Sequence, residues 1–173
     1  MHYTSVWIRS ALAFFVAISL AGGGCTKQAT GPEEMITANK ELDRTFDEAF
    51  KAKDLEMMMK CWWKNSDAVL YPSDNIEGRK GWDEIKASVK LMVEGTEQVV
   101  SIKRINTKYV VLGDAVMGEG MLAMSIIPKG APRQVDLLLR YTSLREIKEG
   151  RWVYVYRHES MNPMLGSDLS IGN

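Results

Sequence analysis

Long segments of alternating apolar and polar residues fill the second half of this 173-residue chain, and they constrain its fold more than any other feature. They predict four strands, which run over 97–107, 110–126, 132–147 and 151–160. Strands of this length twist and coil, so we expect them to form a curled antiparallel sheet. The residues that separate them favour turns: Asn106, Gly113, the sequence PKGAP at 128–132, and Glu149-Gly150.

Apolar residues at helical spacing come before these strands. They predict one long amphipathic helix at 33–52, a short helix for which Asp54 is the N-cap, and a third helix at 81–93. A short strand at 68–71, which Pro72 ends, lies between the second and third helices. Helices followed by a meander of strands predict an α+β fold. We expect a cone of three helices in a curled sheet of four to five antiparallel strands, with an apolar interior.

The first 24 residues have the layout of a secretory signal peptide. Arg9 precedes the apolar run ALAFFVAISLA, which is too short to span a bilayer comfortably and is followed by three glycines. Cys25 comes next, which resembles the lipidated cysteine of a bacterial lipoprotein box, although Gly22 stands where that pattern usually has Leu. An ordinary signal peptide that is cut nearby is the alternative. With either kind of signal peptide we expect export to the cell envelope. If the signal is that of a lipoprotein, Cys25 is lipidated and residues 25–32 form a tether.

Charge excludes one class of partner and does not explain membrane attachment. The chain has 22 basic and 22 acidic residues, so no polycationic face for nucleic acid is expected. Loss of Arg9 with the signal peptide leaves 22 − 1 = 21 basic against 22 acidic residues, so attachment would come from lipid and not from charge. Cys61, the other cysteine, lies in a helix pattern, and we expect it to be a small buried apolar residue.

The chain resembles the nuclear transport factor 2-like superfamily, and within it the SnoaL-like group of polyketide cyclase and ketosteroid isomerase relatives. The resemblance covers about residues 33–161 and leaves 162–173 as a loosely ordered tail. It depends on the order of the elements and on several short motifs: Tyr71-Pro72, Gly78 with Trp82 and Ile85, Arg140 with Thr142, Gly150 with Trp152, and His158 with Ser160. This superfold hosts isomerases, hydrolases and binding proteins, so the resemblance implies a fold more than an activity.

Strand alternation predicts that the even-numbered residues from Trp152 to Ser160 share one face. The resemblance implies that Arg140 and Thr142 face the same cavity, where arginine and histidine could hold a carboxylate or carbonyl oxygen. In the alternative, His158 bonds a neighbouring element and only orders the core. The predicted ligand-binding residues are Trp62, Tyr71, Arg140, Thr142, Tyr156 and His158.

Catalysis has weaker support. In ketosteroid isomerase relatives, an aspartate that acts as the catalytic base stands directly before the proline that ends the first strand. Here Tyr71 occupies that position. Asp136 and Arg140 are about 13 Å apart along one strand, too far to pair as an epoxide hydrolase relative would need. The candidate catalytic residues are His158, Glu119 and Asp136, and the two acids could be bases with a raised pKa. Alternatively, these acids pair with an arginine or face solvent.

No metal or cofactor is expected, because His158 would be the only histidine left after signal removal. The face of strand 132–147 that carries Val135, Leu137, Leu139 and Tyr141 is predicted to point outward. A homodimer through the outer sheet would cover it, and packed helices would do so equally well. The predicted function is therefore binding of a small apolar or amphipathic ligand. The alternative is a SnoaL-like isomerase, cyclase or hydrolase that acts on a carbonyl compound.

Overall fold

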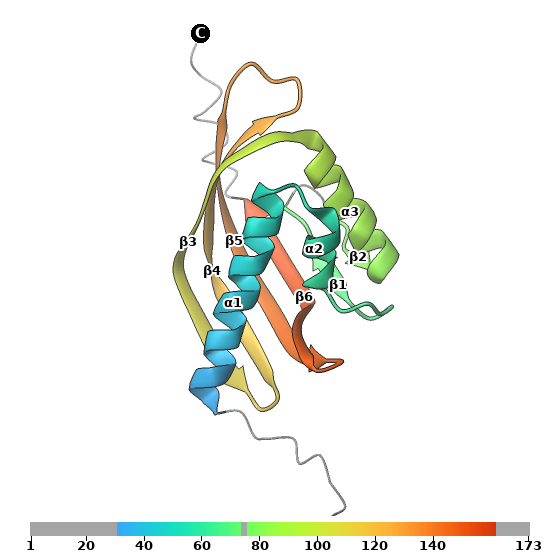
Figure 1. Cartoon of the computed structure of the whole chain (residues 1–173), viewed down its shortest axis with the longest axis vertical. Coiled ribbons are helices and arrows are strands. Elements are labelled where there is room, and N and C mark those ends of the chain that lie inside the picture. The colour runs from blue at the N-terminus through green and yellow to red at the C-terminus, as the bar shows by residue number, and fades with distance from the viewer. Residues whose placement is uncertain (1–30, 74–75, 162–173) are drawn as a thin grey trace, which may run out of the picture.

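A computed structural model describes residues 31–73 and 76–161, which form three helices and one six-stranded sheet. The helices lie on one side of the curved sheet (Figure 1). Their bounds are Pro32–Lys51 for α1, Leu55–Lys60 for α2 and Trp82–Gly95 for α3. The strands are β1 (Val69–Tyr71), β2 (Arg79–Lys80), β3 (Thr96–Leu112), β4 (Ala115–Pro128), β5 (Val135–Lys148) and β6 (Arg151–Met161).

The order of strands across the sheet is β2-β1-β6-β5-β4-β3. Strands β3 to β6 form the predicted antiparallel meander, and β1 pairs with β6 in parallel. The α+β cone is therefore confirmed, with a mixed sheet of six strands where four to five antiparallel strands were expected. The predicted strand at 68–71 is β1, and the two-residue strand β2 is the additional strand, which is too short to predict from alternation.

The predicted helical stripes form the core between the helices and the sheet. Side chains from all three helices and from β3 to β6 make one hydrophobic cluster. Asp54 is the N-cap of α2, and its carboxylate accepts from the backbone N–H of Met57. Cys61 is buried, as predicted, and burial raises the pKa of its thiol to about 12. This cysteine is therefore a packing residue and not a nucleophile.

One predicted strand break is wrong. Strand β3 continues through Asn106 to Leu112, and the hairpin turn to β4 lies at Gly113, which has φ = 62°. Asn106 has φ = 51°, and the pairing with β4 shifts between Ile105 and Lys108. The asparagine thus makes a bulge within one strand, because its left-handed backbone displaces the register without ending the pairing.

A second bulge lies in β6 and reverses the face on which its side chains lie. Adjacent residues Leu144 and Arg145 of β5 pair with Tyr156 and Tyr154 of β6, which leaves Val155 as an extra residue. Before the bulge Trp152 and Tyr154 face the core, whereas after it the odd-numbered residues do. The prediction that even-numbered residues share one face from Trp152 to Ser160 is therefore wrong. A shift of one residue moves every later side chain to the other face.

The two faces of β5 are also the reverse of those predicted. Leu137 and Leu139 line the interior and Tyr141 is buried, whereas Arg140 is exposed on the outer face. The apolar alternation of this strand belongs to the core side, as the hydrophobic effect requires. The homodimer remains a prediction, without this apolar face to support it.

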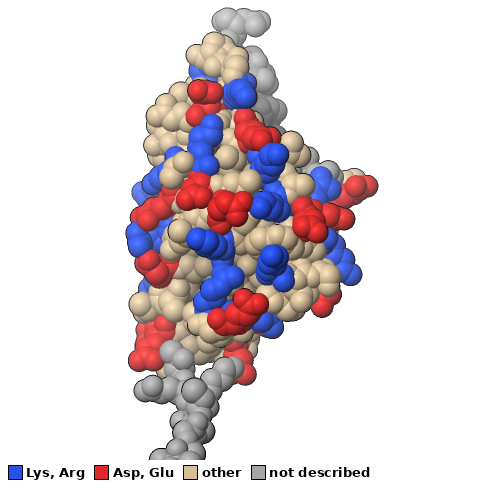
Figure 2. Space-filling model, turned by 45° about the vertical axis from the view of Figure 1, so that its right-hand side comes forward, with Lys and Arg blue, Asp and Glu red and all other residues tan. Residues whose placement is uncertain are grey.

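The predicted signal peptide, Cys25, most of the tether and the tail at 162–173 lie outside the described residues. Within the described part, none of the helices has the length and hydropathy of a membrane span. Acidic and basic side chains alternate over the surface that Figure 2 shows. That face has no field of a single sign to attract nucleic acid.

Candidate ligand-binding cavity

A cavity of about 400 Å³ lies between the helices and the sheet. This volume falls in the range of sites for small organic ligands, about 300–1,000 Å³. The second halves of α1 and α3 and the inner face of the sheet form its walls. Leu91, which is 70% exposed, and Met161 mark its mouth. The remaining wall is mainly apolar and includes Phe46, Phe50, Leu70, Val89, Met92, Ile102, Leu122, Met124, Ile126, Leu137 and Leu139.

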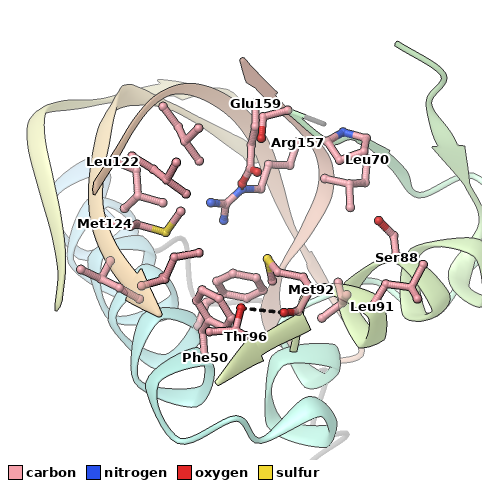
Figure 3. Close-up of a pocket in the computed structure, with 18 of the residues that line it drawn as sticks. Phe50, Leu70, Ser88, Leu91, Met92, Thr96, Leu122, Met124, Arg157 and Glu159 are labelled. Carbon is pink, nitrogen blue, oxygen red and sulfur yellow. Dashed lines mark hydrogen bonds and ion pairs between the residues drawn. The ribbon is translucent and has the colours of Figure 1, made fainter. Parts of the chain in front are cut away.

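Arg157 of β6 points its guanidinium into this apolar space (Figure 3). The residue is 1% exposed, and its Nη1 atom has no hydrogen-bond partner among the described residues. Burial alone would lower the pKa of Arg157, but the electrostatic interactions with Glu159, Tyr154 and Asp43 together outweigh this effect and raise the pKa. The guanidinium also lies 4.9 Å from the ring centre of Phe46. A buried cation with a free N–H is therefore available at the cavity wall.

Two carboxylates line the cavity, and each already has an arginine partner. Glu159 accepts from Arg157 Nε at 2.7 Å. Asp47 accepts from Arg104 Nε and Nη2, each at 2.7 Å, in a bidentate pair. Both acids are thus held in fixed positions by hydrogen bonds from guanidinium groups, and neither is paired with a histidine.

A second polar cluster fills the core beyond the cavity and is centred on Asp43 of α1. Asp43 is 1% exposed, and its carboxylate accepts from Arg145 Nη2 at 2.8 and 2.9 Å, from Tyr109 at 2.8 Å and from Tyr154. Burial alone would raise the pKa of Asp43, but the charges of Arg104, Arg145 and Arg157 and the hydrogen bond from Tyr154 together outweigh it and hold the pKa below its ordinary value. This cluster does not line the cavity. We refer to Asp43, Tyr109, Arg145 and Tyr154 as the Asp43 cluster.

Of the six predicted ligand-binding residues, only Trp62 lines the cavity. The other five come together on the outer face of the sheet. Thr142 is paired with His158, and the rings of Tyr71 and His158 are 6.1 Å apart and nearly perpendicular. Tyr156 lies 6.1 Å from Tyr71, and Arg140 is paired with Ser160. The structure therefore brings these five side chains together on the side of the sheet that faces away from the cavity.

The three candidate catalytic residues also lie outside the cavity. His158 and Glu119 are exposed on the outer face. Asp136 is exposed as well, and hydrogen bonds from Ser125 and Gln134 lower its pKa. The prediction of a raised pKa for Asp136 is therefore wrong, because donors to a carboxylate favour its charged form. Over residues 31–73 and 76–161, no three His, Cys, Asp or Glu side chains gather to hold a metal.

Sequence reasoning missed Asp43, Asp47, Arg157 and Glu159. One signal was present for Asp43, because Asn39, Asp43, Phe46 and Phe50 follow helical spacing and put an acid on an apolar stripe. For Arg157 and Glu159 the alternation of β6 was misleading, since the bulge at Val155 changes the face of both residues.

Comparisons with known proteins agree with this fold. The sequence profile of the family described as "SnoaL-like domain" matches residues 40–164. No curated protein sequence matches the chain.

Several solved structures share the fold at low sequence identity. A nuclear transport factor 2-like superfamily protein from Salmonella enterica subsp. enterica serovar Typhimurium has a TM-score of 0.69 at 12% identity, covering 76% of this chain and 93% of that one. An uncharacterised protein with a cystatin-like fold from Caulobacter vibrioides gives 0.62 at 16% identity, with 78% and 95% covered. A hexachlorocyclohexane dehydrochlorinase, LinA type 2, gives 0.63 at 16%, with 73% and 84% covered. The matched profile spans most of the chain, so this protein belongs to the SnoaL-like domain family of nuclear transport factor 2-like folds.

Proposed function

We propose that this protein binds a small, largely apolar molecule in the cavity of its cone and performs no chemistry on it. The observation that carries the proposal is the cavity of about 400 Å³, which has mainly apolar walls and one buried guanidinium at its side. A folded protein stabilises its core by filling it, and a volume of this size that opens to solvent is typical of a ligand site.

The polar groups at the wall favour binding over catalysis. Proton transfer needs an acid or base that is free to exchange a proton with the substrate. The two cavity carboxylates, Asp47 and Glu159, are hydrogen-bonded to Arg104 and Arg157. No histidine or cysteine is among the described residues that line the cavity.

A neutral fluorescent dye, N-phenyl-1-naphthylamine, tests the proposal. We expect its fluorescence to rise when it enters the cavity, and the variant Ile126→Trp to abolish this rise by filling the space. Ile127→Trp is the matched control, because Ile127 is the next residue of β4 and does not line the cavity. Equal dye binding by the two variants, or none by the unaltered protein, would exclude a binding cavity.

The enzyme alternative is a SnoaL-like isomerase, cyclase or hydrolase that acts on a carbonyl compound. One observation favours it, namely that two carboxylates line the cavity. Its candidate groups would be Asp47 and Glu159 in place of His158, Glu119 and Asp136. Turnover of cyclic ketones or esters that is lost in Asp47→Asn or Glu159→Gln would establish it.

We also propose that the protein is exported to the cell envelope and anchored by a lipid on Cys25. The support is the charged, apolar and glycine-rich order of the first 24 residues before that cysteine. Metabolic labelling with radioactive palmitate should mark the protein, and Cys25→Ser should remove the label and release it from the membrane fraction. Label retained by Cys25→Ser would contradict the anchor.

A further inference from the structure

We propose that the ligand is a monocarboxylic acid with an apolar body, and that its carboxylate binds Nη1 of Arg157. This inference depends on the proposed binding function and adds the chemical class of the ligand. It rests on three properties of the cavity wall. They are a hydrogen-bond donor without an acceptor, the net charge of the lining residues, and the positions of the polar and apolar residues along the wall.

The unfilled donor is Nη1 of Arg157. A buried N–H without an acceptor costs free energy, because it has lost its bonds to water. This nitrogen has no partner among the described residues, whereas Nε of the same guanidinium donates to Glu159. A ligand oxygen beside Nη1 would satisfy the donor. Arginine forms strong, charge-assisted hydrogen bonds with a carboxylate.

The charge balance favours a single negative charge on the ligand. Asp47 and Glu159 line the cavity, and each is paired with an arginine, Arg104 or Arg157. Arg79 also lines the cavity, and no ion pair joins it to another residue of the described ranges. Among the described residues that line the cavity, the charge of Arg79 is therefore left without an ion-pair partner. A monoanion neutralises it, whereas a dianion would place an unpaired negative charge in an apolar space.

The direction of approach follows from where the polar and apolar parts of the wall lie. The guanidinium of Arg157 is stacked among buried rings, 5.6 Å from the ring centre of Tyr141 and 5.4 Å from that of Tyr154. Leu91, Gly95 and Met161, the exposed lining residues, lie where the cavity reaches the surface. The carboxylate would therefore enter first and leave the apolar body against Met92, Met124 and the leucines.

Competition between two molecules of equal length tests this assignment. Decanoate carries the carboxylate and decan-1-ol does not, and each would displace N-phenyl-1-naphthylamine from the protein near neutral pH. We expect decanoate to bind about 10- to 100-fold more tightly than decan-1-ol, as a charge-assisted hydrogen bond in a buried site implies. Equal affinity for the two molecules would overturn the proposal.

Variants of adjacent residues assign the effect to one side chain. Arg157→Met should remove the preference for decanoate and leave decan-1-ol binding within about twofold. Glu159→Gln should strengthen decanoate binding, because it removes the carboxylate that shares the guanidinium. His158→Met is the matched control, since His158 is exposed on the opposite face of the same strand. It should change neither affinity.

The outcomes separate this inference from the proposed function. Dye and decan-1-ol binding that persists with no preference for decanoate would contradict the acid and retain the cavity. Absence of binding by all three molecules would contradict both. If Arg157→Met does not fold, Arg157→Lys and Glu159→Gln decide the matter: unchanged decanoate affinity in both variants would overturn the role of Arg157.

Discussion

The cone contains two groups of buried arginine, carboxylate and aromatic side chains, and they differ in what surrounds them. In the Asp43 cluster, the two carboxylate oxygens accept from Arg145, Tyr109 and Tyr154, and the cluster does not line the ligand-binding cavity. At the cavity wall, Arg157 has one carboxylate partner, Glu159, and its guanidinium points into about 400 Å³ of mainly apolar space. Its Nη1 atom has no hydrogen-bond partner among the described residues.

The difference indicates that arginine–carboxylate hydrogen bonds stabilise the fold in one group and can bind a ligand in the other. A carboxylate that is surrounded by donors fixes the helix that carries it to the sheet, because each hydrogen bond ties α1 to a different strand: β3 through Tyr109, β5 through Arg145 and β6 through Tyr154. Arg145 also has nitrogens without a hydrogen-bond partner among the described residues, but it does not line the cavity. The guanidinium of Arg157 lies at the cavity wall and can instead exchange bonds with an incoming molecule. We therefore expect changes in the first group to affect stability and changes in the second to affect binding.

The largest effect is expected from Asp43→Ala. This change leaves Arg145, which is 0% exposed, as a buried charge without its acceptor, and removal of one partner from a buried ion pair costs about 3–5 kcal/mol. Urea denaturation should show that loss in the free energy of unfolding. Asp136→Ala, at an exposed acid, is the control and should cost about 0.5 kcal/mol or less. Similar losses in the two variants would contradict the structural role of Asp43.

A smaller loss is expected from Gly118→Ala. A Cβ atom at this position of β4 would overlap the guanidinium of Arg145, so the arginine or the strand must move. Such overpacking costs about 1–3 kcal/mol. Gly95→Ala is the control, because no atom lies within 4 Å of the Cβ it would add. Thermal unfolding of the two variants measures the difference, and a neutral Gly118→Ala would mean that Arg145 does not lie against this glycine.

The smallest effect is expected from Glu119→Gln on the outer face. Glu119 is exposed and lies outside the cavity, so both dye binding and stability should stay close to those of the unaltered protein, within about 0.5 kcal/mol for unfolding. Titration with N-phenyl-1-naphthylamine and urea denaturation measure these quantities. A clear loss of dye binding would indicate that the ligand binds on the outer face of the sheet and not inside the cone.

The helices and the fold class could be predicted from the sequence because they depend on periodicity that persists over many residues. The stripe of α3 from Ile85 to Met92 and the long strands of the meander are of this kind. The apolar alternation of β5 was equally clear, but it was assigned to the outer face on the basis of the resemblance. The structure places Leu137 and Leu139 inside.

The site could not be predicted in the same way, because it depends on single residues that break the pattern. Val155 shifts the register of β6 by one residue, and this alone exchanges His158 for Arg157 at the cavity wall. In the sequence, Arg157 and Glu159 are two charged residues at alternate positions of a strand, a pattern that is typical of a solvent-exposed face. Only the packing of helices against that strand makes Arg157 buried and Glu159 half-buried.

Methionine methyl resonances test most directly the claim that the inner face of the cone is the binding face. Met124 of β4 lines the cavity, and Met121 of the same strand does not. In protein labelled with ¹³C at the methionine methyl groups, we predict that saturating decanoate shifts the resonances of Met124 and Met92 and leaves that of Met121 in place. A shift of Met121 with none at Met124 and Met92 would contradict the account.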